Sequence, residues 1–382
     1  MKTLYVHIGT HKTGTSALQH FLKINKERLK PKGYMYPLFP KYKYPRKLTE
    51  RNGLFLSSLI IDEQGKRHIQ EEDERRVEAL SQIHDYFQTY DTIILSDEAL
   101  WRNLCTRPRI LRHLVRDSEE FDYRLVLVIY LRRQDDMIES MLYQRIKRDP
   151  DFLDDLATYT DEQKQFLDYS YVLKCLSEYV PEENIIVRRF DEARKNGGIE
   201  LDFMNLIGLE LTDEYVIETG RNTSLYGNTA YIKKVINSLD SLEYKESKLF
   251  RESLTMSSGP SKRSYPCSIF SPEERAEFMA GFEDSNAAIT AKYLSDGKPL
   301  FSLDYSGPVK WSADNPYLIE DIIRSFAASD VLLQRQLDRA KEEQLRLQNQ
   351  VDELQEQMEK RLGAVERRLE NMRHPFKKIM GK

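Results

Sequence analysis

Apolar residues form short continuous runs in the first half of the chain, and each run ends in polar residues followed by a helix-like pattern. These runs cover residues 4–8, 93–95 and 125–131, the second lying in a strand predicted within residues 91–101. Continuous apolar runs are typical of parallel strands that helices cover on both faces. A further strand, a polar turn and an amphipathic helix are indicated over residues 184–209. The pattern predicts an α/β fold built on a parallel sheet with helices on both faces.

The apolar pattern changes at about residue 325, where a 3-4 spacing begins. Gln344 occupies one core position, and a stutter is indicated near Gly363; the apolar series is Leu337, Ala340, Leu347, Val351, Leu354, Met358, Leu362, Val365, Leu369 and Met372. This predicts an α/β domain over residues 1–320 and a coiled-coil arm over residues 325–372. Such a helix cannot bury its apolar seam alone. We expect self-association or another coiled coil through residues 333–372, or packing back on the domain.

Composition excludes several classes of protein. The 382 residues carry a net charge of −4, so the chain as a whole offers no basic surface for nucleic acid. Three widely separated cysteines predict neither a disulfide framework nor a zinc site. No apolar run is long enough for a membrane span, and the first strand begins almost at once, so we expect a cytoplasmic protein without a signal peptide. The basic tail, residues 373–382, is a solvated end or a weak contact with anionic lipid or polymer.

The loop after the first run has the pattern of a phosphate site. Gly9, Gly14 and Ser16 fit the spacing G-x-x-x-x-G-K-[ST], in which loop amides and a helix N-terminus face an anion. The expected lysine is replaced by Thr15, and the loop lysine is Lys12. A lysine displaced in this way meets the anion from the loop, at the leaving-group end. The spacing therefore disfavours a triphosphate-hydrolysing site.

Two other strand ends carry chemically active side chains. Ser96, Asp97 and Glu98 follow the second run, and ligands in open α/β sheets lie beyond the carboxyl ends of parallel strands. Arg132 follows the third run, with Ser140 eight positions later. An arginine at a strand end and a serine two turns into the next helix can close on one phosphate. Arg133 is an alternative to Arg132.

These motifs resemble one family. Residues 12–18, KTGTSAL, resemble the 5′-phosphosulfate loop of PAPS-dependent sulfotransferases, nearest in style to heparan sulfate N-sulfotransferases and bacterial sulfotransferase-like proteins. The Arg132 and Ser140 pair resembles the 3′-phosphate motif of that family. Phe190-Asp191 resembles the pair that closes a later strand. The loop of residues 257–266 with the helix after it resembles the segment that closes over the 3′-phosphate, which points to Lys262 and Arg263, with Arg221 as a weaker candidate.

The resemblance implies a P-loop-like fold and transfer of a sulfuryl group from PAPS to a hydroxyl or amine of a carbohydrate or glycolipid. Under this hypothesis Thr13, Gly14, Thr15 and Ser16 bind the 5′-phosphate, and Lys12 stabilises the leaving oxygen of the product PAP. Glu98 is the expected base, because related heparan sulfate enzymes use a glutamate. His11 and Glu50 are lesser candidates, and Glu98 is otherwise an acid at a helix N-terminus. No metal is required.

Two other functions remain open. A P-loop kinase or NTPase would place ATP and magnesium around Ser16 and Asp97. A non-catalytic scaffold would use the coiled coil for assembly on a degenerate domain. Residues 23–51 are basic and carry four tyrosines, which predicts an irregular loop that holds an acidic sugar polymer or forms a solvated lysine face. With a cytoplasmic start, this suggests a bacterial surface-polysaccharide or glycolipid precursor as acceptor.

Overall fold

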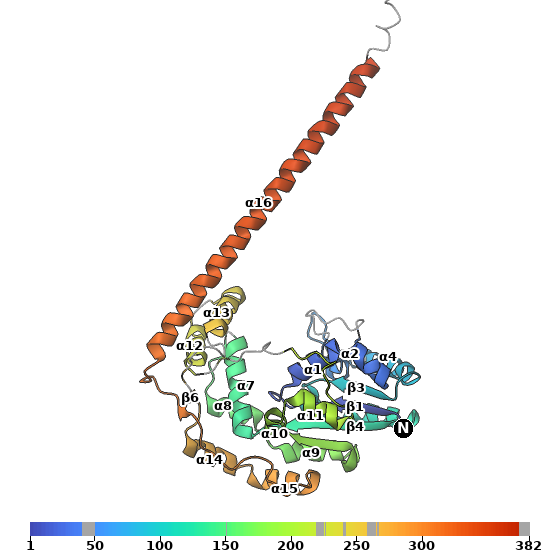
Figure 1. Cartoon of the computed structure of the whole chain (residues 1–382), viewed down its shortest axis with the longest axis vertical. Coiled ribbons are helices and arrows are strands. Elements are labelled where there is room, and N and C mark those ends of the chain that lie inside the picture. Colours follow the sequence, from blue (N-terminus) through green and yellow to red (C-terminus); the bar gives the residue numbers. More distant parts are fainter. Residues whose placement is uncertain are drawn as a thin grey trace, which may run out of the picture.

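A five-stranded parallel sheet forms the centre of the molecule, in the order β2-β3-β1-β4-β5 (Figure 1). The strands are β1 (Thr3–His7), β2 (Tyr34–Met35), β3 (Thr92–Ser96), β4 (Arg124–Leu131) and β5 (Ile185–Arg189). His7 at the end of β1 pairs with Ser96 on one side and Val128 on the other. The carboxyl ends of β3, β1 and β4 therefore lie at one edge of the sheet. The predicted α/β class with a parallel sheet is confirmed.

The computed structural model describes most of the chain. The described residues are 1–39, 50–149, 151–218, 225, 227–239, 242–257, 265 and 267–373. Among the predicted site residues, Lys262, Arg263 and Arg221 lie outside this part of the chain, as does the basic tail beyond residue 373.

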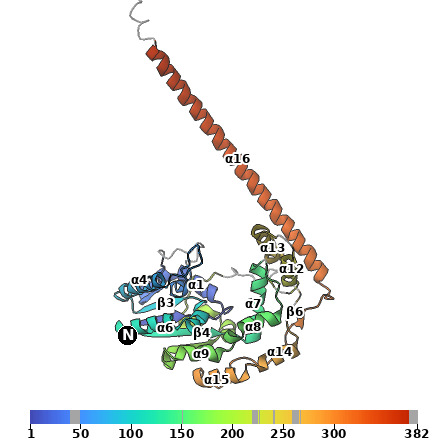
Figure 2. The same ribbon diagram turned by 180° about the vertical axis from the view of Figure 1, so that it is seen from behind.

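Helices cover both faces of the sheet because successive residues of a strand point to opposite sides. On β4, Leu127 and Ile129 face one apolar cluster, and Val128 and Tyr130 face the other. The first face is covered by α4 (Ile69–Phe87), α5 (Leu100–Thr106), α6 (Pro108–Glu120) and α9 (Tyr169–Ser177). The second face is covered by α1 (Thr15–Ile24), α2 (Lys26–Leu29), α10 (Phe190–Lys195) and α11 (Ile199–Leu206) (Figure 1). Figure 2 shows α4, α6 and α9 beside the sheet from behind.

The remaining elements extend the body beyond the sheet. Three short elements precede or connect the strands: η1 (Lys30–Lys32), α3 (Leu54–Ser57) and η2 (Glu182–Asn184). Beyond the carboxyl edge stand α7 (Gln134–Arg148), α8 (Leu156–Leu167), α12 (Asn228–Asn237), α13 (Tyr244–Ser257), β6 (Cys267–Ser268), α14 (Pro272–Ala280) and β7 (Val309–Lys310). Helix α15 (Glu283–Tyr293) packs on α9 and β5. Helix α14 begins with a capping box, in which the Glu274 amide donates to the Ser271 hydroxyl at 3.2 Å.

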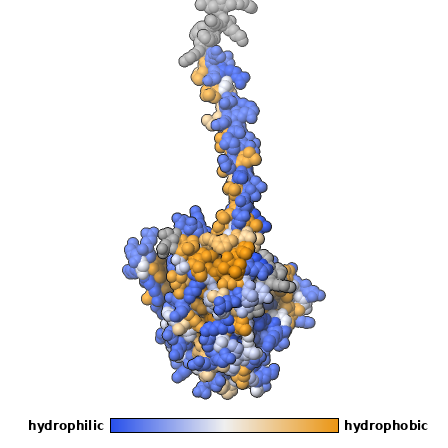
Figure 3. Space-filling view, turned by 90° about the vertical axis from the view of Figure 1, so that its left-hand side faces the viewer, coloured by the Kyte–Doolittle hydropathy of each residue, from blue (hydrophilic) through white to orange (hydrophobic). Residues whose placement is uncertain are grey.

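The C-terminal helix α16 (Leu318–Arg373) is a single helix of 56 residues that projects from the body (Figure 3). At 1.5 Å per residue it is about 80 Å long. Most of its length contacts no other described element, so the apolar side chains of the predicted coiled coil are exposed. None of the described helices combines the length and the apolar content that a bilayer crossing requires.

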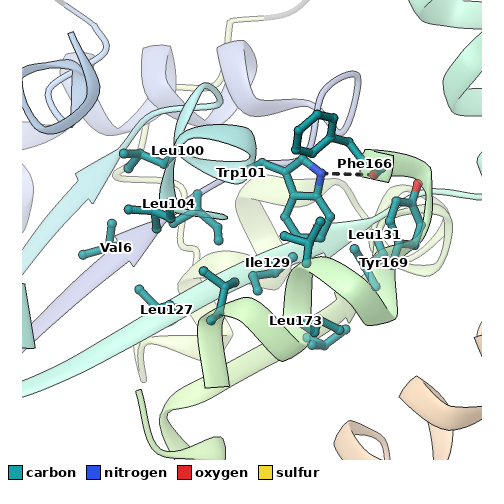
Figure 4. Close-up of a cluster of buried hydrophobic side chains, with 14 of the residues drawn as sticks. Val6, Leu100, Trp101, Leu104, Leu127, Ile129, Leu131, Phe166, Tyr169 and Leu173 are labelled. Carbon is teal, nitrogen blue, oxygen red and sulfur yellow. Dashed lines mark hydrogen bonds between the residues drawn. The ribbon is translucent and has the colours of Figure 1, made fainter. Parts of the chain in front are cut away.

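Trp101 anchors the start of α5 within the larger apolar cluster (Figure 4). Its ring packs edge-on against Tyr169, and its indole N–H donates to the Phe166 carbonyl at 3.3 Å. The Trp101 amide donates to the Ile8 carbonyl at the end of β1, 3.2 Å away. These contacts fix the turn that carries residues 97–99 beside the loop after β1.

The basic segment of residues 23–51 differs from the predicted irregular loop in its described part. The described part forms α2, η1 and β2, and its two tyrosines, Tyr34 and Tyr36, turn inward. Tyr36 is fully buried and donates to the Glu50 carbonyl at 2.5 Å, while Tyr34 donates to the Ile207 carbonyl at 2.7 Å. Both rings pack in the cluster of the second sheet face, where Tyr36 is fully buried and Tyr34 partly buried. Residues 40–49 lie outside the described part.

Candidate active site at the carboxyl edge of the sheet

The loop between β1 and α1 has an unusual backbone. Gly9, Lys12 and Gly14 all have a positive φ, of 76°, 65° and 74°. A positive φ is rare for a lysine and costs of order 1–3 kcal/mol, and such strain is concentrated at functional sites. Left-handed residues alternating with ordinary ones turn successive amides toward one side of a loop. The backbone of this loop is therefore shaped as an anion cradle.

The amides of this cradle are unpaired. Within the described part of the chain, those of residues 12–16 donate to no carbonyl and no side chain. Helix α1 has neither a side-chain cap nor an acidic residue in its first turn. The hydroxyls of Thr13 and Thr15 instead donate to the Thr10 carbonyl, at 2.7 and 3.4 Å, and hold the loop closed. The positive end of the helix is left available to an anion.

The cradle joins two strand ends. The Thr10 hydroxyl donates to the Tyr130 carbonyl of β4 at 3.0 Å. On the other side, a Cβ added to Gly9 would lie 3.0 Å from the Cα of Glu98. A Cβ on Gly14 would lie 3.2 Å from the Phe190 ring, which supports the loop from below. Glycine is required at both positions by the backbone conformation and by the close approach of neighbours.

Lys12 lies in a positively charged environment. Burial, followed by the charges of Arg132 and Arg148, lowers the pKa of Lys12 to about 8, while Glu98 opposes this shift. Neither Lys12 nor Arg132 forms an ion pair with any acid in the described part of the chain. Like charges held together without an ion-pair partner are unfavourable in an isolated protein, and a bound dianion would relieve their repulsion.

Arg132 reaches the loop from the end of β4. Its Nη1 donates to the Lys12 carbonyl at 3.2 Å, and its guanidinium lies 5.9 Å from the centre of the Phe190 ring. The Nε is buried and has no hydrogen-bond partner among the described residues. A buried donor without a partner is costly, which indicates that a ligand completes its shell. The Tyr169 hydroxyl donates to the Arg132 carbonyl at 2.6 Å and fixes this turn.

Arg133 is committed elsewhere. Its Nε donates to the carboxylate of the buried Asp135 at 2.8 Å, and its Nη1 donates to the Asp304 carbonyl at 2.7 Å. Its guanidinium also faces the Tyr305 ring. Of the two arginines that the sequence left open, Arg132 faces the loop and Arg133 ties β4 to the segment that follows α15.

Glu98 and His11 lie on the other side of the loop. Glu98 is half-buried, and its charge raises the pKa of both Lys12 and His11. The pKa of His11 is nevertheless lowered overall, mainly because the side chain is buried and also because of the positive charges of Arg51, Arg102 and Lys12. The carboxylate, imidazole and ammonium groups therefore influence one another's protonation.

The other predicted acids are engaged. Glu50 accepts from His20 at 3.0 Å and from Lys23 at 3.4 Å; burial opposes its charge, but these bonds prevail and hold its pKa below the usual value. Asp97 is fully buried, and burial raises its pKa. The Nε and Nη2 of Arg51 donate to the Asp97 carboxylate at 3.0 and 2.7 Å, and the Ala99 amide donates to it at 2.7 Å. No group of three metal-ligating side chains occurs in the described ranges.

Ser140 and Ser16 contribute differently from the loop residues. Ser140 is half-buried on α7, two turns beyond Arg132, and its hydroxyl has no hydrogen bond within the described structure. Ser16 is exposed at the start of α1. The structure brings together Lys12, Glu98, His11 and Arg132, and leaves Ser140 without a direct contact to the loop.

Some residues of this site gave no usable signal in the sequence. Arg148 stands at the end of α7, and Arg102 in α5, yet both act on the loop. Phe190 was expected only to close a strand, but it lies beneath Gly14 and beside Arg132. Arg148 is one of three basic residues in the last turn of α7, and Arg102 is one exposed helical cation among many, so no local pattern distinguishes either.

Comparison with known proteins gives one structural likeness to report. No protein-family model matches the sequence, and no curated protein matches it. The fold is similar to the crystal structure of a sulfotransferase from Alicyclobacillus acidocaldarius, with 12% identity and a TM-score of 0.40, over 78% of this chain and 97% of that chain. A likeness at this level concerns the path of the chain alone.

Proposed function

We propose that this protein is a sulfotransferase that moves a sulfuryl group from PAPS to a hydroxyl or amine of a carbohydrate or glycolipid. The observation that carries the proposal is the junction of two anion-binding elements. Within the described part of the chain, the amides of residues 12–16 are unpaired, and the Arg132 Nη1 donates to the Lys12 carbonyl while the Arg132 Nε is buried without a hydrogen-bond partner. PAPS carries a phosphate at each end of one ribose, so it needs two such elements side by side.

The residues have separate roles in this proposal. The amides of residues 13–16 and the Ser16 hydroxyl bind the 5′-phosphate, because the hydroxyls of Thr13 and Thr15 already donate to Thr10. Arg132 and Ser140 bind the 3′-phosphate, with Lys262 and Arg263 as further ligands from outside the described residues. Arg148 adds positive charge on the same side of Lys12.

Lys12 and Glu98 carry the chemistry. PAPS supplies an activated sulfuryl group; its bond to the bridging phosphate oxygen breaks as the bond to the acceptor oxygen or nitrogen forms. Lys12 donates to the oxygen on which negative charge develops, a preorganised form of stabilisation. Glu98 accepts the proton of the acceptor, and His11 beside it is the alternative base. No metal takes part in this scheme.

The geometry argues against a kinase or NTPase. The acid that would hold magnesium, Asp97, is buried and gripped by both nitrogens of one side of Arg51. The lysine of the loop is at position 12, at the leaving-group end. A protein that acts only as a scaffold needs neither the positive φ of Lys12 nor the unpartnered, buried Nε of Arg132 at the carboxyl edge of the sheet.

The proposal is tested by binding and by transfer. Isothermal titration should show that PAP binds more tightly than ATP with magnesium, and a preference for ATP overturns the proposal. Labelled sulfate should then pass from PAPS to glycan or glycolipid extracts, and Lys12→Ala should abolish the transfer without changing the mass of the assembly. Failure of any extract to accept sulfate, with no release of PAP, would favour the scaffold.

A further inference from the structure

The first turns of α16 bury polar side chains against the body and expose apolar ones to solvent. The side chains that face the body are polar or small, and Asp321, Ser325 and Ser329 are buried there. The side chains that face solvent are large and apolar, with Ile319, Ile323 and Phe326 exposed by 73%, 62% and 65%. A helix on a folded body normally buries its apolar face. In a single chain this apolar face therefore remains exposed to solvent.

Hydrogen bonds fix the rotation of α16 about its axis. The Asn228 amide donates to the Asp321 carboxylate at 2.8 Å. The hydroxyls of Ser325 and Ser329 donate to carbonyls one turn earlier in α16, at 2.7 and 3.0 Å. A rotation that buried Phe326 would expose these satisfied groups and remove the Asp321 contact. The outward direction of the apolar face is therefore built into the body.

The outward face continues into the predicted coiled coil. Ile319, Ile323 and Phe326 have the same 3-4 spacing as Leu333 and Leu337. Asp330 is the polar residue between the two groups. We call the apolar side chains that follow this spacing along α16 the seam: Ile319, Ile323, Phe326, Leu333, Leu337, Ala340, Leu347, Val351, Leu354, Met358, Leu362, Val365, Leu369 and Met372.

Apolar side chains of the body add to the seam at its base. Val235 and Leu239, at the end of α12, are 68% and 54% exposed, and α12 packs beside α16. Figure 3 shows apolar side chains gathered where α16 leaves the body. We call Ile319, Ile323, Phe326, Val235 and Leu239 the base patch. Exposed apolar side chains gathered on neighbouring elements in this way mark a candidate interaction site.

We propose that a second copy of this chain covers both the seam and the base patch, in a parallel, in-register coiled coil. In a parallel pair the two bodies lie at the same end, so the two base patches meet. In an antiparallel pair they would lie about 80 Å apart, at opposite ends of the arm, and would stay exposed. The parallel arrangement is the one that buries the whole apolar face.

The residues beside the seam fit an identical partner. Charged residues at the flanking positions usually select a different partner. Here those positions are mostly uncharged glutamines: Gln334, Gln336, Gln348, Gln350, Gln355 and Gln357. Two copies therefore meet without repulsion between like charges there. Beyond the stutter, Arg361 and Glu366 occupy flanking positions five residues apart, which pair with opposite charge between parallel copies.

The mass of the full chain in solution tests the proposal. Sedimentation of the wild type should give a dimer at micromolar concentration, and Leu347→Asp with Val351→Asp should give a monomer. Asn349→Asp, on the outer side of the same turn, should remain a dimer. The body should keep its thermal transition in all three, because these positions contact no body element. A monomeric wild type, or a dimer that survives the double substitution, overturns the proposal.

Crosslinking tests the direction of the pair. A cysteine at the core position Leu337→Cys should link two copies on mild oxidation, since parallel register places it beside its own counterpart. Asn349→Cys, on the outer side, should stay unlinked. A stable dimer in which Leu337→Cys does not crosslink contradicts the parallel register. Phe326→Asp should also raise the dimer dissociation constant at least about tenfold, through loss of the base patch; an unchanged constant counts against the base patch as part of the interface.

Discussion

The guanidinium of Arg132 donates a hydrogen bond to the main-chain carbonyl of Lys12, across 3.2 Å. These residues are far apart in the sequence, at the end of β4 and in the loop after β1. Their contact brings the two motifs, for which we propose anion binding, into one surface. Since Lys12 also has a positive φ, its carbonyl is turned toward Arg132 while the amides that follow remain unpaired.

The two neighbouring arginines should respond oppositely to substitution. Arg132→Ala should weaken PAP binding about 10- to 100-fold, the effect of losing charge-assisted hydrogen bonds, and change stability little. Arg133→Ala should leave PAP affinity nearly unchanged and destabilise the fold by about 2 kcal/mol, because the buried Asp135 loses one partner and keeps Arg275. Titration and thermal unfolding of both variants check this. The reverse pattern would assign the phosphate to Arg133.

Affinity for PAP should fall as pH rises through about 8. The pKa of Lys12 is lowered to about 8 by burial and neighbouring cations, so the ammonium that attracts the phosphate is lost above that pH. A bound anion favours the charged form, so binding near pH 8 should take up protons. Titrations in two buffers of different ionisation enthalpy measure this uptake. Lys12→Arg stays charged and should abolish it; a wild type without uptake would contradict the role of Lys12.

The glycine at the start of the loop should be sensitive to a single methyl group. Gly9→Ala should destabilise the protein by about 2–3 kcal/mol and reduce activity, because its Cβ would press on the Glu98 backbone. Gly65→Ala is the matched control: its φ of 81° is similar, but no atom lies within 4 Å of the added Cβ. The control should show only the backbone penalty of about 1 kcal/mol. Equal losses in urea unfolding would mean that the contact with Glu98 has no effect.

Two cysteines that the sequence did not pair should form a disulfide on oxidation. The sulfurs of Cys105 in α5 and Cys175 in α9 lie 2.8 Å apart. Burial raises the pKa of the Cys105 thiol to about 12, so the reaction with hydrogen peroxide should be slow. Two thiols and one peroxide give the disulfide and two waters, and titratable thiols should fall from the three in the sequence to one. The link should stabilise the fold by about 4 kcal/mol. The reference is Cys267→Ser, in which Cys105 and Cys175 are the two remaining thiols. If all three thiols of the wild type were still titratable after oxidation, the packing of α5 on α9 would be contradicted.

The fold could be predicted because its signals are local. The apolar runs of β1, β3 and β4 lie within single strands, and Gly9 and Gly14 mark the turn between β1 and α1. The parallel sheet and its helices on both faces follow from these patterns. The short β2 was missed, because residues 23–51 are rich in lysine and proline and its pairing with β3 depends on distant residues.

The site could be predicted only in part. Lys12, Glu98 and Arg132 follow strands, so the shared edge of a parallel sheet brings them together. The choice of Arg132 over Arg133 depends on Asp135 and the carbonyl of Asp304, which no local pattern reveals. The sequestering of Asp97 by Arg51 is likewise a tertiary contact. The base patch could not be predicted, because the sequence of the first turns of α16, from Leu318 onward, is typical of a helix that packs on a domain.

The central claim is that the loop of Lys12 and the side chain of Arg132 grip the two phosphates of one ligand. The most direct measurement is titration of PAP and of 5′-AMP, which lacks the 3′-phosphate, into the wild type and Arg132→Ala. The wild type should bind PAP at least about tenfold more tightly than 5′-AMP, and Arg132→Ala should remove most of that difference while leaving affinity for 5′-AMP intact. Equal affinity of the wild type for the two ligands, or a preference for PAP that persists without Arg132, would contradict the account.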